Sequence, residues 1–408
     1  MTNDYSKEKR VYNKRTVLKY SAIALVTVAL FGSLFYLMLL PQNAEDSLPI
    51  QSMGEQPPES DPEPFEVLFM DDDPCECCPE CNQTECVCDE CGVSDECECL
   101  ELESSEPETS DQEINFDDPD IEVASVEDFV RAISPNKTIT LQAGLYDVST
   151  VVGFDSPYIE WRHDSYGLNE RTLVINGVDN LTLQAAPGAE VEIVTPYKFA
   201  EVLAFSNCND ISLIGIKAGH TITGQYECDD GVIGLNNCSN IFIENCHFYG
   251  CGSVGITMRD CNNALIRDTI IDDCSRAALI IDNSNDIEFI NCRFVDNRAY
   301  QYIICINYSQ VTFTDCEISG NNGLSGSVIE VDYFGGTSNV LFDRCIIKNN
   351  TPNTSWYNGE PVFVGVINNP IFEGKPYIGI RDSEVELGPF ARYWRNDDVT
   401  DLGGNLFN

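Results

Sequence analysis

A repeat in the second half of the chain constrains the fold more than any other feature. Between residues 173 and 371 a polar turn followed by apolar residues recurs, as in DNLTL, NDISL, SNIFI and NDIEF. The first apolar positions of the repeats are Leu181, Ile211, Ile241, Ala264, Ile287, Val311, Val340 and Ile371. The shortest spacings between them define a unit of about two dozen residues, which lies in the range of solenoid repeats.

Apolar residues alternate with other residues just before each turn. One column of equivalent positions holds Leu203, Ile233, Ile256, Leu279 and Ile303, and the column two places later holds Phe205, Leu235, Met258, Ile281 and Cys305. A period of two predicts β-strands that turn every second side chain into a core.

Cysteine and asparagine also recur at fixed places in the repeat. Their columns are Cys208, Cys238 and Cys261; then Cys246, Cys292, Cys316 and Cys345; then Cys251, Cys274, Asn297, Asn321 and Asn350. Stacked strands place equivalent residues about 4.8 Å apart, so we expect the asparagines to form an amide ladder and the cysteines to be buried as small hydrophobes. Disulfides between vertical neighbours, and a metal site that includes His247, are less favoured alternatives.

The segment before the repeats predicts a capping helix. In SVEDFVRAI, Ser125 to Ile133, a serine N-cap precedes acidic residues, and apolar residues share one face. TITLQAGLY, residues 138–146, then supplies a first strand and turn.

These motifs resemble the right-handed parallel β-helix of the pectate-lyase-like superfamily over roughly residues 121–370. A narrower resemblance, to uncharacterised bacterial surface proteins with β-helix repeats, comes through AGHTITGQYECDDGVIGLNNCSNIFIENCHFYGCGSVGI, residues 218–256. The resemblance implies an all-β solenoid with an N-terminal capping helix over residues 121–408. It does not specify the function, because this fold carries lyases, hydrolases, epimerases, adhesins and structural spikes.

The N-terminus predicts a membrane anchor. Residues 1–19 are basic, and residues 20–40, YSAIALVTVALFGSLFYLMLL, carry no charge over about 31 Å of helix, enough to cross a bilayer. A cleaved signal peptide is the alternative, but the apolar stretch is long for one. We expect an uncleaved signal anchor with a cytoplasmic N-terminus and an extracellular remainder.

Residues 41–120 predict an extended acidic stalk. They contain no Lys or Arg and many Asp, Glu, Pro and Ser residues, and they supply most of the formal net charge of −44. Such a segment repels itself and cannot bury a core, so it is expected to be disordered. The charge also argues against a nucleic acid partner.

A cysteine cluster lies inside this stalk. CECCPECNQTECVCDECGVSDECEC contains two CxxC pairs, Cys78/Cys81 and Cys88/Cys91, which could offer four thiolates to zinc. Outside the cell, disulfides or crosslinks are favoured over metal binding, and a biased tract without a specific role is a third interpretation.

One long loop gathers residues able to do chemistry. Asp229, Asp230 and His220 would lie beside the outward residues Arg259 and Asp282, so that acid, base and cation could converge. The DD and GH pairs resemble motifs of polygalacturonase-like enzymes, in reversed order, and a lyase would imply calcium. The favoured alternative is that Asp229, Asp230 and His220 stabilise their own loop. His247 is expected on an exposed turn face.

Aromatic residues gather in the later turns and loops. Tyr300, Tyr302, Trp356 and Tyr357 could stack on sugars or pack loops on the solenoid, and packing is favoured for each one. The leading hypothesis is a surface module that binds a glycan or another component of the cell envelope. A polysaccharide lyase or glycoside hydrolase, and an architectural surface protein crosslinked through stalk cysteines, are the alternatives.

Overall fold

The computed structural model describes residues 114–222, 230–250, 253–299, 302–322, 327–332, 337–352, 362–366, 376–390, 392–394 and 399–408. The predicted tail, the predicted anchor and the stalk up to residue 113, with its cysteine cluster, lie outside these residues. Within the described part of the chain, no helix is both long enough and apolar enough to cross a membrane.

The described strands form three long sheets. The first sheet contains β1 (Asp120–Val123), β2 (Lys137–Leu141), β6 (Asp179–Ala185), β9 (Asn209–Ile214), β12 (Ser239–Glu244), β15 (Asn262–Arg267), β18 (Asn285–Ile290), β21 (Gln310–Thr314), β24 (Asn339–Asp343), β27 (Tyr377–Arg381) and β30 (Val399–Asp401). The second sheet contains β3 (Gly144–Asp147), β7 (Val191–Thr195), β10 (Lys217–His220), β13 (His247–Tyr249), β16 (Ile270–Asp272), β19 (Arg293–Val295), β22 (Glu317–Ser319), β25 (Ile346–Lys348), β28 (Glu384–Val385) and β31 (Leu406–Phe407). The third sheet contains β4 (Ile159–His163), β5 (Arg171–Asn176), β8 (Leu203–Ser206), β11 (Ile233–Asn236), β14 (Val254–Arg259), β17 (Ala277–Asp282), β20 (Ile304–Asn307), β23 (Ser327–Val331), β26 (Val362–Val366) and β29 (Arg392–Trp394).

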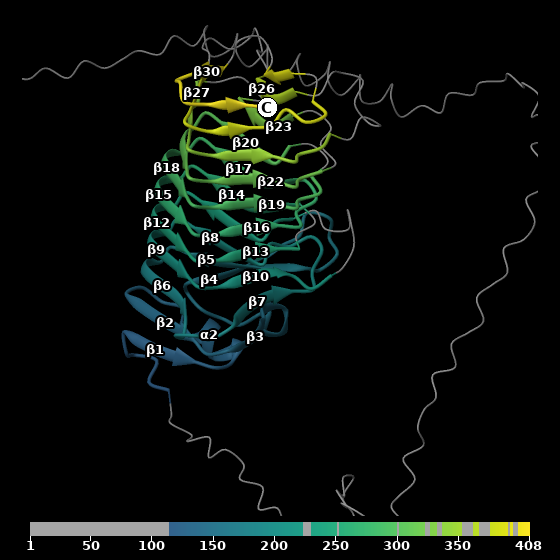
Figure 1. Cartoon of the computed structure of the whole chain (residues 1–408). Helices are drawn as coiled ribbons and strands as arrows, with labels where there is room; N and C mark the ends of the chain where they lie inside the picture. Colours follow the sequence, from purple (N-terminus) through teal and green to yellow (C-terminus); the bar gives the residue numbers. More distant parts are fainter. Residues whose placement is uncertain are drawn as a thin grey trace, which may run out of the picture. The chain divides into compact units, whose positions relative to one another are not determined.

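Successive coils stack into a solenoid. Each coil of the repeat region contributes one strand to each sheet, and each strand pairs in parallel with its equivalents in the coils before and after, as β12 does with β9 and β15 (Figure 1). The pairing of β4 with β5 is antiparallel. The predicted all-β solenoid with long parallel sheets is confirmed.

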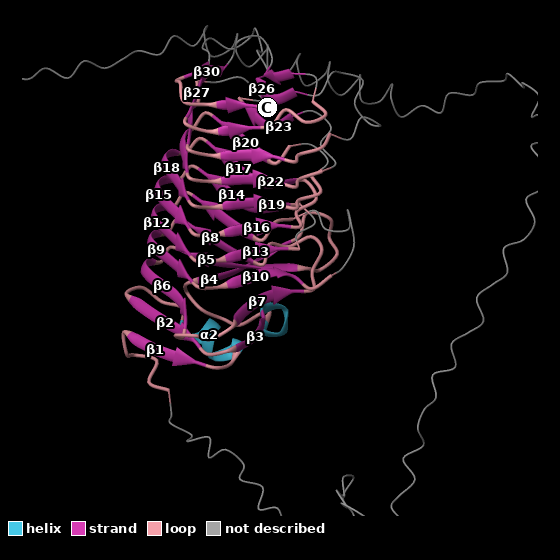
Figure 2. Ribbon diagram, viewed as in Figure 1, coloured by secondary structure: helices cyan, strands magenta, loops and turns pink. Residues whose placement is uncertain are grey.

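A short helix covers the first coil, as the sequence predicted. Helix α2 (Val126–Ala132) begins after Ser125, whose hydroxyl accepts a hydrogen bond from the backbone N–H of Asp128 at 3.1 Å. Phe129 and Val130 are fully buried against the first coil. Together with the 3₁₀ turn η1 (Val148–Val151), α2 lies at the N-terminal end of the solenoid (Figure 2).

The apolar columns are confirmed over four coils and shift by one residue in the fifth. Leu203, Ile233, Ile256 and Leu279 are in register, but Leu279 then pairs with Ile304, where the sequence predicted Ile303. Residues 303–306 are all apolar, so they carry no period-two signal that could set the register. Cys305 therefore faces outward, where it packs with Val254, Ala277, Ile280 and Tyr302.

The last predicted repeat position was also wrong. Val340 pairs with Ile378, and Ile371 lies outside the described residues. The connection between β26 and β27 is longer than the other connections from the third sheet to the first, and the stretch NPIFE in it resembles a turn followed by a strand.

The sharp turns between sheets explain the recurring Asn and Asp residues. Asn237, Asp260 and Asn283, between the third and first sheets, have φ values of 52°, 53° and 49°. Left-handed backbone of this kind costs Asn, Asp and Gly less than other residues, so those residue types mark the corners.

The polar and thiol columns lie inside the solenoid. Asn297 donates from its side-chain amide to Oδ1 of Asn321 at 2.9 Å, and Asn321 donates to Oδ1 of Asn350 at 2.8 Å. All three side chains are buried. The ladder cysteines that the sequence analysis named are buried free thiols in this structure: Cys208, Cys238, Cys261, Cys246, Cys292, Cys316 and Cys345.

Candidate functional site

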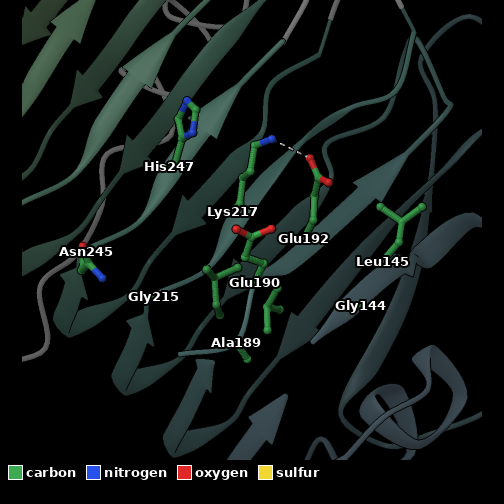
Figure 3. A pocket seen from close by; sticks show the side chains of 11 residues that line it. Gly144, Leu145, Ala189, Glu190, Glu192, Gly215, Lys217, Asn245 and His247 are labelled. Carbon is green, nitrogen blue, oxygen red and sulfur yellow. Dashed lines mark ion pairs between the residues drawn. The ribbon is translucent and has the colours of Figure 1, made fainter. Parts of the chain in front are cut away.

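A groove of about 540 Å³ runs along the outward face of the second sheet. Its side chains come from successive coils, and we call it the second-sheet groove. The charged and polar residues that line it are Glu190, Glu192, Lys217, Asn245 and His247. Leu145, 63% exposed, lies at its N-terminal end (Figure 3).

Strand alternation and register bring these side chains together. Lys217 pairs with Glu192 on one side and with His247 on the other, so the three form one column. The next residues along β10 and β13, Ala218 and Phe248, are buried in the core. Because successive side chains of a strand point to opposite faces, Lys217 and His247 face outward.

A lysine, a glutamate and a tyrosine form the centre of the site. Nζ of Lys217 lies 3.0 Å from Oε1 of Glu192, and Figure 3 shows the two side chains pointing toward each other. The ammonium also lies 4.3 Å from the ring centroid of Tyr249. The Tyr249 hydroxyl donates a hydrogen bond to Glu192, so both ends of the phenol are engaged.

A histidine and an aspartate continue the cluster along the sheet. Nε2 of His247 lies 3.0 Å from each carboxylate oxygen of Asp272. The imidazole also contacts the Tyr249 ring, with centroids 5.5 Å apart. The five side chains thus form one connected network over four successive coils, from β7 to β16.

The network sets the protonation of its acidic groups. Partial burial acts to raise the pKa of Glu192, but hydrogen bonds from Tyr249 and Lys217 outweigh it and leave that pKa below its ordinary value. Burial and the hydrogen bond to Glu192 raise the pKa of Tyr249. At neutral pH, Glu192 is therefore a carboxylate and Tyr249 a neutral phenol, and neither is poised to exchange a proton.

Two side chains at the edge of the groove stay open to a ligand. Glu190 and Asn245 are exposed, and neither side chain hydrogen-bonds to another described residue. The groove therefore presents an acceptor, an amide and the outer atoms of the paired network. Such a surface suits recognition of a ligand rich in hydroxyl groups.

The predicted catalytic cluster does not converge in the described residues. Arg259 and Asp282 face each other on the third sheet, with Nε and Oδ2 3.5 Å apart. Asp230 precedes β11, and Arg259 pairs with Asn236, the last residue of that strand, so the two lie toward opposite ends of the strand. The described residues therefore do not bring Asp230 beside Arg259 and Asp282. Asp229 lies outside the described residues.

His220 does not lie in a groove either. It ends β10, its side chain is 3% exposed, and Nε2 lies 2.9 Å from the carbonyl oxygen of Ala200. Burial lowers the pKa of the imidazole. A neutral, enclosed ring of this kind contributes to the structure of the coil and does not reach a ligand.

Of the predicted aromatic binding residues, the structure describes only Tyr302. It packs against the outward cluster around Cys305, and burial raises the pKa of its phenol. This is the packing role that the sequence analysis favoured. Tyr300, Trp356 and Tyr357 lie outside the described residues, as do the stalk residues Cys78, Cys81, Cys88 and Cys91. In the part of the chain that the structure describes, no group of three or more His, Cys, Asp or Glu side chains is placed to hold a metal ion.

Most of the second-sheet groove was not predicted from the sequence. His247 was expected on an exposed turn face, and none of Glu190, Glu192, Lys217, Tyr249 and Asp272 was selected as a site residue. A signal was present, because aligning the short second-sheet strands places Glu192, Lys217 and His247 in one column.

Comparisons with known proteins agree with the fold. Residues 219–383 match the protein family described as "Right handed beta helix region", so this region is a right-handed β-helix and the predicted resemblance is confirmed at the level of fold. No curated protein sequence matches the chain.

Solved structures with a similar shape include an enzyme and an adhesin. Pectate lyase Pel9A shares 13% identity at a TM-score of 0.41, over 68% of this chain and 73% of the enzyme. PfbA, a surface adhesin of Streptococcus pneumoniae, shares 11% identity at a TM-score of 0.39, over 71% of this chain and 69% of the adhesin. At such identities and TM-scores, no shared activity follows.

Proposed function

We propose that this protein binds a glycan of the cell envelope along the second-sheet groove. The observation that carries the proposal is the connected network of Glu192, Lys217, Tyr249, His247 and Asp272 on an open face. A network whose members hold one another in place is preorganised, so little side-chain entropy is lost when a ligand binds. Within this network each acidic and basic group is paired with another member, which favours binding over catalysis.

The charge of the groove indicates which glycan it takes. Three carboxylates, Glu190, Glu192 and Asp272, face two basic side chains, Lys217 and His247. An excess of negative charge repels uronic acids, whereas carboxylates accept hydrogen bonds from hydroxyl and ammonium groups. We therefore assign a neutral or amino-sugar polysaccharide in preference to an acidic one.

The N-terminus would hold this binding domain at the cell surface. Residues 20–40 would anchor the chain with the β-helix outside, and residues 41–120 would act as an acidic spacer. Deleting residues 20–40 should move the protein from the membrane pellet to the soluble fraction. Retention of the deleted variant in the pellet would contradict the anchor.

The binding test uses the purified full-length chain. It is passed over immobilised neutral, amino-sugar and acidic polysaccharides, and the unretained material is assayed for cleaved products. We expect retention on a neutral or amino-sugar polymer without cleavage. Lys217→Ala should weaken retention, because it removes the central cation and the contact with Tyr249.

A matched control comes from the same sheet. Arg293 and Glu317 form another outward ion pair, with Nε and Oε2 2.9 Å apart, away from the groove. Arg293→Ala should leave retention unchanged. Equal losses in both variants, or cleavage of a polymer, would refute the proposal, and cleavage would favour a lyase or hydrolase.

A further inference from the structure

A second depression lies on a different face of the solenoid. It follows the outward face of the first sheet from Asn263 to Tyr377 and has a volume of about 610 Å³. We call it the first-sheet trough. It crosses five successive strands, β15 to β27, so it is about 19 Å long. Its volume lies in the range of small-ligand sites, about 300–1,000 Å³.

An aromatic platform closes one end of the trough. Tyr377 is 44% exposed, although Tyr is a bulky residue. A Cβ atom added at Gly379 would lie 3.1 Å from the Tyr377 hydroxyl and 3.0 Å from Cδ1 of Leu402. The phenol therefore reaches along its strand over the glycine, between Leu402 and Leu341, and part of it remains open to solvent.

Two amides, Gln310 and Asn339, lie next to this platform. Gln310 pairs with Asn339 and Asn339 with Tyr377, so the three side chains stand in one column. Neither amide side chain hydrogen-bonds to another described residue. Earlier in the same sheet two amides are hydrogen-bonded to each other, since Asn263 donates to Oδ1 of Asn240 at 2.6 Å. Among the described residues, this column therefore has a side-chain hydrogen bond near β15 and none from its amides near β27.

The charge of the trough selects against acidic ligands. Among the described residues that line it, the charged ones are Asp286 and Glu288, and none is Lys or Arg. Polyanions such as uronate polymers or nucleic acids would be repelled. An exposed aromatic ring beside the two amides presents an apolar surface for the C–H face of a sugar and hydrogen-bonding groups for its hydroxyls.

We propose that the first-sheet trough is a second glycan site, which binds a neutral oligosaccharide chain with one sugar ring on Tyr377 and hydroxyl groups on Gln310 and Asn339. The proposal goes beyond the function assigned to the second-sheet groove, because separate residues on a separate sheet carry it. The trough runs along the stacking direction, so consecutive sugar units would meet equivalent positions of consecutive coils.

The test measures binding of the full-length chain to two probes by calorimetry. The probes are a neutral hexasaccharide of β-linked glucose and a hexasaccharide of galacturonic acid. The wild-type protein should bind only the neutral probe. Tyr377→Ala should raise the Kd of the neutral probe about three- to tenfold, the range expected for loss of one aromatic stacking contact. Tyr377→Phe should retain binding, because it keeps the ring.

Two further variants separate stacking from a folding defect. Gly379→Ala keeps Tyr377 but displaces its ring, so it should weaken binding of the neutral probe, as Tyr377→Ala does. Tyr308→Ala removes another tyrosine of matched exposure, 43%, outside the trough and should change nothing. Circular dichroism confirms that each variant is folded.

The outcomes distinguish the two sites. No binding of the neutral probe, binding of the galacturonate probe, or equal effects of Tyr377→Ala and Tyr308→Ala would each overturn the second site. In one outcome, Lys217→Ala abolishes binding of the neutral probe while Tyr377→Ala leaves it unchanged. That result would support the second-sheet groove as the glycan site and refute the first-sheet trough. If Tyr377→Ala weakened binding of the neutral probe and Lys217→Ala did not, the result would support the first-sheet trough and would show that the second-sheet groove does not bind this probe.

Discussion

The inward and outward sides of the same strands follow different rules. Inside, identical side chains stack on one another, as Phe289, Phe313 and Phe342 do with ring centroids 5.1 and 4.9 Å apart. Outside, neighbouring coils carry different side chains that pair by charge, as Lys217 does with Glu192. The interior therefore repeats to hold the coils together, whereas the exterior varies, and ligand recognition can differ from coil to coil.

This comparison predicts its largest effect at the centre of the phenylalanine stack. Phe313 is fully buried between two other rings, so Phe313→Ala should lower the free energy of unfolding by about 3–5 kcal/mol. Urea denaturation measures the change. Thr312→Ala, the outward neighbour, serves as the control, and similar losses in both variants would break the distinction between the two sides.

The buried amide ladder should show the next largest effect. Asn321 donates to the carbonyl oxygen of Phe294 at 2.9 Å and to Asn350, and it accepts from Asn297. Asn321→Ala leaves these buried groups unpaired and should cost about 2–4 kcal/mol. Asn322→Ala, at an exposed position, should change stability by less than about 0.5 kcal/mol in the same denaturation experiment.

Acid should lower the stability of the fold through the buried side chain of His220. Burial lowers the pKa of His220 in the folded protein, so the unfolded chain takes up a proton more readily. The contribution of neutral His220 is complete above the unfolded pKa of about 6.5 and is lost as the pH falls below it. Melting temperatures at pH 7 and pH 5 should differ less in His220→Gln than in the wild type.

An exposed histidine provides the control for this pH effect. His163 lies on the outward part of β4, so His163→Gln should leave the difference between the two melting temperatures as it is in the wild type. A wild-type pH response that persists unchanged in His220→Gln would show that other groups cause it.

The smallest effect on stability is expected in the second-sheet groove. Lys217 is 44% exposed at the side chain, and surface ion pairs contribute about 0–1 kcal/mol. Lys217→Met should therefore change the free energy of unfolding by less than about 1 kcal/mol while it weakens glycan retention. A loss as large as that of Phe313→Ala would mean that the groove is structural.

Sequence alone was sufficient for the repeat, the strands, the corners and the capping helix. Those features depend on local patterns: alternation in the strands, Asn and Asp at left-handed turns, and Ser125 before an amphipathic segment. The same reasoning failed where the pattern disappeared, at the apolar run around Ile303 and at Ile371 in a long connection.

The sites were determined by the tertiary structure. Asp230 and Arg259 are near each other in the repeat yet lie toward opposite ends of a strand, while Glu192, Lys217 and His247, from three coils, form one column. Which outward side chains meet depends on the register between coils and on which atoms of each side chain find a partner. Sequence determined the stacking of coils because burial repeats along the chain; only the assembled sheets decided which polar groups are paired and which remain free for a ligand.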